Sequence, residues 1–288
     1  LVGLGIIVGY LLIPVVHFTW PISPFIAGYV GISFAKDRTD SPAIRGLKYG
    51  AWIGVFSLAV FIMIALALIA VLDIGPNKDT KDRLNDYVEC LKIFSKVADY
   101  ITINISSPNT PGLRELQEDD HIRDVVKACT SHRAKRGGSK PILLKFAPDL
   151  PRDDLLSCAG AALSAGIDGF IATNTTISRP APKTTSSRQF FAEQGGLSGK
   201  PLHDKSIQII GDLYDSIGGK VPIVGCGGID SGNSAWNAIT NGSSLLQLYS
   251  AMVFQGPSVV KRVTKGLKAK IENQGFADLQ EVVGYTRP

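Results

Sequence analysis

Charge is scarce in the first quarter of the chain. Residues 1–72 hold only six charged side chains and two of the five net positive charges of the 288-residue sequence. The other three net charges are spread over 216 residues, which is too dilute for a surface that binds nucleic acid. We therefore expect no nucleic-acid partner.

Cysteine and histidine are also sparse, with four of each. The four cysteines, Cys90, Cys129, Cys158 and Cys226, form no CxxC pair, which argues against a disulfide framework and against a zinc site. The histidines show no metal-type spacing either. The sequence therefore predicts buried free thiols and no bound metal.

The lack of charge becomes informative between Tyr49 and Leu72, where 24 consecutive residues carry none. A helix rises about 1.5 Å per residue, so this run can cross a bilayer core of about 30 Å. The alternative is a buried core helix, but core helices seldom run this long without a polar face. A second uncharged run, Leu1–Phe18, predicts an earlier span. Together the two runs predict an all-α transmembrane hairpin over residues 1–73, with the lipid bilayer as its partner.

From residue 74 onward, short β-rich runs alternate with longer amphipathic ones. Strands are expected at 99–106, 141–147, 167–173, 221–226 and 244–249. Helices are expected at 80–97, 121–132, 153–165, 204–216, 233–240 and 257–274. The strands are continuous apolar runs, which is typical of strands covered on both faces. The alternation predicts parallel βαβ units and suits either a barrel or a doubly wound sheet.

Polar residues decide between these two folds, because they directly follow each predicted strand. The segments are SSPNT (106–110), PD (148–149), TNTT (173–176), GCGG (225–228) and YS (249–250). A (β/α)₈ barrel builds its active site from the carboxyl ends of several strands, whereas a doubly wound sheet binds its ligand mainly at one switch point. The pattern therefore predicts an α/β domain over residues 74–288 that is a partial TIM barrel with about five of eight strands.

The last two of these loops point to a phosphate. In barrels the final loops commonly hold a phosphate group. Gly227 and Gly228 let backbone N–H groups approach an anion, and the helix that follows has an N-terminus that favours negative charge. Tyr249 and Ser250 add further donors. A third glycine-rich loop, GGLSGKP (195–201), is expected on the same rim.

Six strings of residues, in order, resemble class 2 dihydroorotate dehydrogenases, the quinone-linked type. They are INISSPNTPGLRELQ (103–117), LLKFAPDL (143–150), GFIATNTTISRP (169–180), GGLSGKPL (195–202), VPIVGCGGIDSG (221–232) and LLQLYSAMVFQGP (245–257). The resemblance runs from about Ile74 to near the C-terminus. It implies a flavoprotein of pyrimidine biosynthesis that oxidises dihydroorotate to orotate with FMN and passes the electrons to a membrane quinone. For a eukaryotic chain it also implies the mitochondrial inner membrane.

The resemblance also implies roles for individual residues. Ser107 matches the catalytic base, and because serine is a weak base we expect it to relay its proton to a water or a neighbouring hydroxyl. The positions that match substrate-binding residues are Asn104, Asn109, Thr110, Asn174 and Thr175. The positions that match FMN contacts are Lys145, Thr173, Ser198, Gly199, Gly227, Gly228, Tyr249 and Ser250. The chemistry agrees, because an Asn amide offers both a donor and an acceptor to a planar anion, and a lysine at the end of a buried strand needs an anion beside it.

The sequence departs from the family pattern before residue 74. Segments that resemble the first strands of the barrel are absent from residues 1–72. The stretch VLDIGPNKD (71–79) aligns with a family stretch that reads roughly V-N-[LI]-G-x-N-K, so Asp73 stands where an asparagine contacts the flavin. A carboxylate there is expected to repel an anionic reduced flavin. The join at about 70–75 has the character of a fusion, a mis-assembled gene model or a chimera.

Three functional hypotheses follow. The leading one is a membrane-bound dihydroorotate dehydrogenase-like flavoprotein, inactive if the missing part of the barrel is not supplied. A second copy of the chain, or a partner that provides the missing strands, could close the barrel. The second hypothesis is a non-enzymatic membrane protein that carries a barrel remnant. The third is another FMN- or phosphate-binding barrel oxidoreductase with a different substrate.

Overall fold

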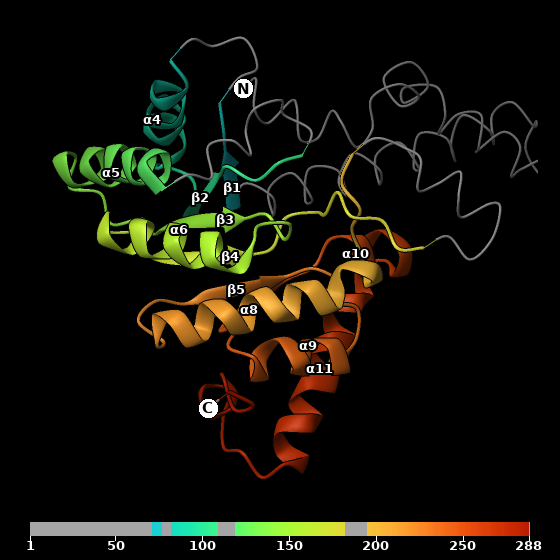
Figure 1. Cartoon of the computed structure of the whole chain (residues 1–288). Helices are drawn as coiled ribbons and strands as arrows, with labels where there is room; N and C mark the ends of the chain where they lie inside the picture. The colour runs from blue at the N-terminus through green and yellow to red at the C-terminus, as the bar shows by residue number, and fades with distance from the viewer. Residues whose placement is uncertain (1–70, 77–81, 109–118, 182–194, 288) are drawn as a thin grey trace, which may run out of the picture. The chain divides into compact units, whose positions relative to one another are not determined.

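The structure is a computed structural model that describes residues 71–76, 82–108, 119–181 and 195–287 (Figure 1). The expected transmembrane hairpin lies outside these ranges and stays a prediction. Within them, the helices are all too short or too polar to cross a membrane.

Six parallel strands form one sheet in the order in which they occur along the chain. The strands are β1 (Val71–Ile74), β2 (Tyr100–Asn104), β3 (Ile142–Phe146), β4 (Gly169–Ala172), β5 (Ile223–Cys226) and β6 (Leu245–Gln247). The helices between and after them are α4 (Arg83–Phe94), α5 (Asp119–Lys135), α6 (Arg152–Ser164), α8 (His203–Ile217), α9 (Gly232–Thr240), α10 (Ser250–Gln255) and α11 (Ser258–Asn273). Sequential parallel strands joined by helices are the repeating unit of a (β/α) barrel, so the described part is a parallel half-barrel.

One strand was not expected. The first two residues of β1, Val71 and Leu72, are the last two residues of the run predicted to be a membrane span. The strand pairs with β2, with Asp73 opposite Thr102. The prediction of about five strands is therefore wrong by one. An apolar run cannot be assigned to helix or strand by periodicity alone, and here the pairing with β2 decides the last residues of the run.

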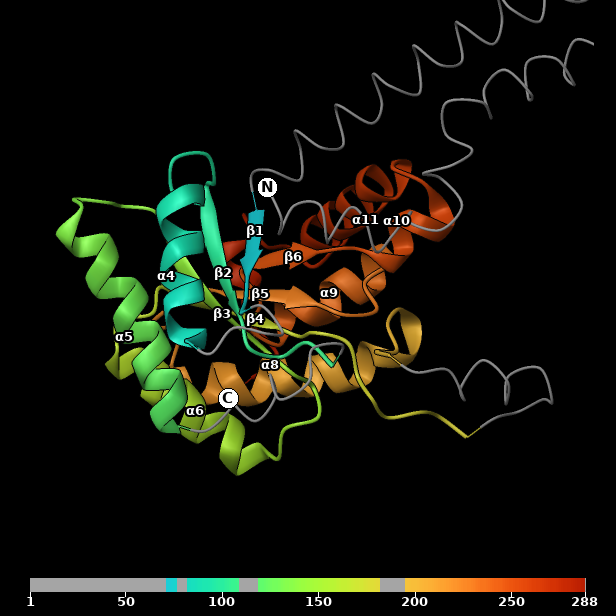
Figure 2. The same ribbon diagram turned by 90° about the horizontal axis from the view of Figure 1, so that it is seen from above.

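The sheet has two faces because side chains alternate along each strand. One face packs against the surrounding helices and is sealed by large apolar residues, among them Ile103, Leu144 and Phe146, which are fully buried. On the other face Leu143, Ile171 and Val224 cluster together. Figure 2 shows the helices on the outside of the sheet.

This second face is the inner face of the half-barrel. One hydrogen bond across it shows that the sheet is curved. The side-chain amide of Gln247 on β6 donates to the hydroxyl of Tyr100 on β2 at 2.8 Å. These strands are not neighbours in the sheet, so their side chains meet only because the sheet curls. Side chains of β2 and β6 therefore meet across the inner face.

The helices confirm the sequence pattern. All six predicted helices are present, and two show clear end signals: Ser231 caps α9 with a capping box, and Gly218 ends α8 in the left-handed conformation. The short helix α10 was not expected; it begins at Ser250, the second residue of the polar pair at 249–250.

Candidate functional site

Parallel strands bring their carboxyl ends to one edge of the sheet, and three of the expected polar residues meet there. The amide of Asn174, just after β4, donates to Asn104 at 3.3 Å and to the Ser106 hydroxyl at 3.0 Å. The backbone N–H of Ser106 also donates to the Asn104 side chain at 3.1 Å. Asn104 and Asn174, separated by 70 residues in sequence, therefore form one hydrogen-bonded cluster.

The remaining members of the expected substrate site are only partly described. Ser107 directly follows this cluster and is half-buried. The backbone N–H of Thr175 donates to the Asn174 side chain at 2.8 Å, which orients the amide. Asn109 and Thr110 lie outside the described residues.

Lys145 lies on the inner face beside this cluster, but its charge is balanced within the protein. Its ammonium donates to the carboxylate of Asp73 on β1 at 2.9 Å, and the two side chains are 15% and 25% exposed. Burial alone would lower the pKa of Lys145, but the adjacent Asp73 carboxylate outweighs it, and the pKa lies above its ordinary value. Lys145 was expected to meet an anion of the cofactor, but in the structure its partner is the Asp73 carboxylate, 72 residues earlier in the chain.

The inner face around this pair is polar at its rim. Tyr100 lies close enough to Asp73 and Lys145 to feel both charges, and burial raises the pKa of its hydroxyl. Burial also raises the pKa of Cys226 at the end of β5, while Lys145 opposes this shift. All four cysteines are free thiols, but Cys90 and Cys226 are only half-buried. Within the described ranges, three or more potential metal ligands do not gather anywhere.

Two loops meet at the expected phosphate end. The hydroxyls of Ser198 and Ser250 are 2.8 Å apart, and a Cβ on Gly199 would lie 3.5 Å from Ser250. Gly199 has a φ of +77°, which favours glycine. Tyr249 precedes α10 and is 54% exposed, so its ring projects from this rim. The structure thus brings together residues from the 195–201 loop and from the end of β6.

The glycine pair after β5 has a clear packing role. A Cβ on Gly227 would lie 2.1 Å from the Ser206 hydroxyl, and one on Gly228 would lie 2.9 Å from the backbone nitrogen of His203. The pair therefore lets the loop pack directly on the start of α8. The N-terminus of α9 is partly occupied by its own cap, because the N–H of Ser234 donates to Ser231.

Thr173 was expected to contact the cofactor, but the structure gives its hydroxyl partners inside the protein. The residue is 1% exposed, and its Oγ1 lies 3.1 Å from the Ser206 hydroxyl and donates to the carbonyl of Asn174 at 2.9 Å. Its role in the structure is to tie the end of β4 to α8.

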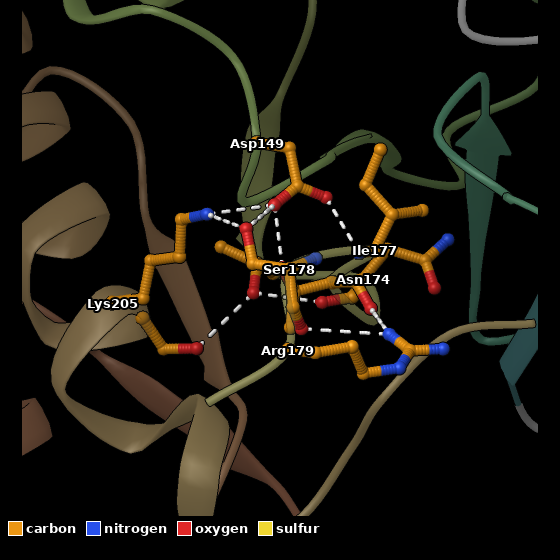
Figure 3. A network of polar contacts seen from close by, with 9 residues as sticks. Asp149, Asn174, Ile177, Ser178, Arg179 and Lys205 are labelled. Atoms are coloured by element: carbon orange, nitrogen blue, oxygen red, sulfur yellow. Dashed lines mark hydrogen bonds and ion pairs between the residues drawn. The ribbon is translucent and has the colours of Figure 1, made fainter. Parts of the chain in front are cut away.

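A second network, around Asp149, holds the loop that carries Asn174 (Figure 3). The Asp149 carboxylate accepts from the N–H of Ile177 at 2.9 Å, from Lys205 at 2.7 Å and from the hydroxyls of Thr176 and Ser178. Arg179 donates to the carbonyl of Thr176 at 3.1 Å. The segment PD at 148–149 predicted a polar loop. The contact between Asp149 and Lys205 could not be predicted, because Lys205 lies on a separate helix.

The profile of the family described as dihydroorotate dehydrogenase matches residues 68–271. The chain belongs to the dihydroorotate dehydrogenase family. The match begins six residues before Ile74, where the sequence resemblance was expected to start, and so includes all of β1.

Two relatives carry the name dihydroorotate dehydrogenase (quinone), mitochondrial. The protein from Oryza sativa subsp. japonica is 43% identical over 250 residues, or 85% of this chain and 50% of the relative. The protein from Mus musculus is 44% identical over 215 residues, or 74% of this chain and 54% of the relative. The chain therefore spans about half the length of the curated relatives it matches.

Solved structures agree with the fold. The crystal structure of DHODH from Eimeria tenella in complex with ferulenol has a TM-score of 0.71 and 37% identity, covering 76% of this chain and 62% of that one. The ligand-free form from the same organism has a TM-score of 0.70 and 36% identity, covering 76% of this chain and 64% of that one. The half-barrel therefore has the fold of the corresponding part of these dihydroorotate dehydrogenase structures.

Proposed function

We propose that the chain is a quinone-linked dihydroorotate dehydrogenase-type flavoprotein that oxidises dihydroorotate to orotate with FMN. The observation that carries the proposal is the cluster of Asn104, Ser106 and Asn174 beside Lys145 at the carboxyl ends of β2, β3 and β4. Two side-chain amides in one place suit a planar ligand with amide edges, such as orotate, and Lys145 beside them matches a cofactor contact.

The residues fit FMN best at its phosphate. Ser198, Gly199 and Ser250 form one rim, and the φ of Gly199 lets its backbone approach a ligand. We propose Gly227, Gly228 and Tyr249 as further contacts on the same side. At the flavin ring of FMN the proposed contact is Lys145, whose positive charge is balanced by Asp73.

The protein's own part in the reaction is binding, orientation and proton transfer. When bound, FMN would accept the hydride that dihydroorotate loses. Ser107 takes the proton from the adjacent substrate carbon and passes it to a water or hydroxyl. Asn104 and Asn174 fix the substrate ring, with Thr175, Asn109 and Thr110 as further proposed contacts. The Asp149 network holds the loop that presents Asn174, so the amide is set before substrate arrives.

The remaining proposals concern the surroundings of the domain. The residues before β1 form a membrane hairpin joined to the barrel by fusion. The domain that starts with β1 at Val71, rather than at residue 74, binds the flavin, and a membrane quinone reoxidises it. The relatives named mitochondrial support the mitochondrial inner membrane as the location in a eukaryote. A second copy of the chain, or a partner that supplies further strands, completes the barrel.

One experiment tests the activity directly. The full chain is purified in detergent, its flavin absorbance is recorded before and after addition of FMN, and orotate formation is followed with dihydroorotate and a soluble quinone. We expect bound flavin and quinone-dependent orotate formation. A chain that stays colourless and inactive while binding membranes would instead be the non-enzymatic remnant. Bound flavin that dihydroorotate fails to reduce would favour an oxidoreductase with another substrate.

A further inference from the structure

The ion pair between Asp73 and Lys145 joins two strands that are not neighbours. Asp73 lies on β1 and pairs in register with Thr102 on β2, whereas Lys145 lies on β3. The carboxylate must therefore reach across β2 on the inner face, and Thr102 is small enough to permit this. The resulting contact is 2.9 Å long and mostly shielded from water, with side chains 15% and 25% exposed.

Such a pair has almost no net charge to offer to a third group. A lysine without a counter-ion at this depth would attract any anion that entered the inner face. With Asp73 at 2.9 Å, the attraction to an incoming anion is offset by repulsion from the carboxylate. The two residues belong to the same polar cluster, because Lys145 pairs in register with Asn104, whose side chain binds Asn174.

We infer that Asp73 is an internal competitor for Lys145, which weakens the binding of FMN and weakens that of its anionic reduced form most. The inference rests on the proposed function, since it assumes that the flavin ring lies beside Lys145. Asp73 is then a positioning and tuning residue that acts through Lys145. The resemblance supplies the contrast, because the aligned family stretch has an asparagine here, which can hydrogen-bond to a lysine without cancelling its charge.

The test compares charge-changing variants by FMN affinity and by the potential of the bound flavin. Asp73→Asn should tighten FMN by about tenfold, as expected when a buried charge partner changes. It should also favour reduced over oxidised flavin by about tenfold, which for a two-electron couple is about 30 mV. Asp73→Glu, which keeps the carboxylate, should retain the parent affinity and potential. Affinity is measured by quenching of FMN fluorescence, and the potential by titration against reference dyes.

Asp168→Asn is the matched control. It removes an ion pair of similar exposure, with Arg133 and Asp168 20% and 37% exposed, at the opposite end of the sheet. We expect it to lower the melting temperature and leave FMN affinity and potential unchanged. This control separates loss of an ion pair in general from loss of the charge beside Lys145.

A second variant keeps the inference falsifiable if Asp73→Asn folds poorly. Asp73→Ser also removes the carboxylate and leaves a hydrogen-bonding group beside Lys145, so it should tighten FMN by a similar factor. In the double variant Asp73→Asn/Lys145→Gln two amides replace the ion pair, and FMN should bind about tenfold more weakly than in either single variant, because no uncompensated positive charge remains. Single variants that bind FMN no more tightly than the double variant would overturn the inference.

The outcomes also separate the inference from the proposed function. If parent and Asp73→Asn bind FMN with equal affinity and equal potential, the inference is wrong and the proposed function stands. If both the parent and every variant fail to bind FMN, both are wrong. Tighter binding with a more positive potential in Asp73→Asn alone supports both.

Discussion

The two faces of the sheet are built by the same six strands but carry different kinds of residue. The face towards the helices holds fully buried Ile103, Leu144 and Phe146. The inner face holds Asn104 and Lys145, each only one residue further along the same strands, beside the apolar cluster of Leu143, Ile171 and Val224.

This difference shows how one strand can serve two purposes. The helix-facing residues bury apolar area and set the fold, whereas the inner-face residues place amides and charges where a ligand can meet them. Substitutions on the first face should therefore act on stability, and substitutions at the polar rim of the second should act on ligand binding and turnover.

The largest effect is expected on the helix-facing side. Phe146→Ala removes a fully buried ring that lies 5.5 Å from the ring of Phe170, so it leaves a cavity that its neighbours cannot fill. We expect a loss of about 3–5 kcal/mol in the free energy of unfolding, measured by denaturant titration. Phe146→Leu should cost less than half as much. A loss below about 1 kcal/mol for Phe146→Ala would contradict the assignment of this face as the core.

The inner rim should show the reverse behaviour. Ser107→Ala should lower orotate formation by about 10²- to 10⁴-fold, the usual contribution of a positioned base. Its melting temperature should stay close to that of the parent, because only one hydroxyl is removed. Ser157→Ala, which removes a hydroxyl that contacts Asp119 on the outer helices, should leave turnover unchanged. Unchanged turnover in Ser107→Ala would favour a different substrate.

Substitutions in the Asp149 network should have effects of intermediate size, because this network stabilises the loop that carries Asn174. Asp149→Asn weakens contacts with a backbone N–H, a lysine and two hydroxyls, and should cost about 1–3 kcal/mol in unfolding free energy. Lys205→Met removes only one of these contacts and should cost less. Limited proteolysis should cut the loop after β4 faster in Asp149→Asn. Equal effects of the two substitutions would show that the ion pair alone holds the loop.

The smallest effect is expected at the C-terminal tail, far from both faces. A hydrogen bond from Arg287 lowers the pKa of Asp215, so this pair stabilises the fold above the ordinary pKa of 3.8. Its contribution is fully present above that value and is lost as pH falls through the lower pKa of the folded protein, where the carboxylate becomes protonated. Arg287→Ala should cost at most about 1 kcal/mol at neutral pH and less at pH 3, as followed by thermal unfolding at both pH values. A larger difference at pH 3 than at pH 7 would refute this pairing.

Much of the half-barrel could be predicted from the sequence. The apolar strand runs and the amphipathic helices have distinct periods, and the loops with polar residues follow strands β2 to β6. The strand β1 was not predicted, because its first two residues are the end of the uncharged run Tyr49–Leu72, which also suits a helix, and because only pairing with β2 defines it. The helix α10 is too short for periodicity to show.

The residues of the candidate site could be proposed from the sequence, but the contacts between them could not. Motif order identified Asn104, Lys145 and Asn174, and the structure brings them to one edge of the sheet. The contact between Asp73 and Lys145 spans 72 residues and crosses a strand, so sequence spacing holds no signal for it. The same holds for Lys205, which reaches Asp149 from a different helix.

The hydrogen bond between Gln247 and Tyr100 has a consequence for folding. Each strand pairs with the next one in sequence, so the sheet can grow from one end in short steps. The contact between β2 and β6 joins residues 147 positions apart and forms only when the sheet has curled. We therefore expect this contact to form late in folding, after the neighbouring strands have paired.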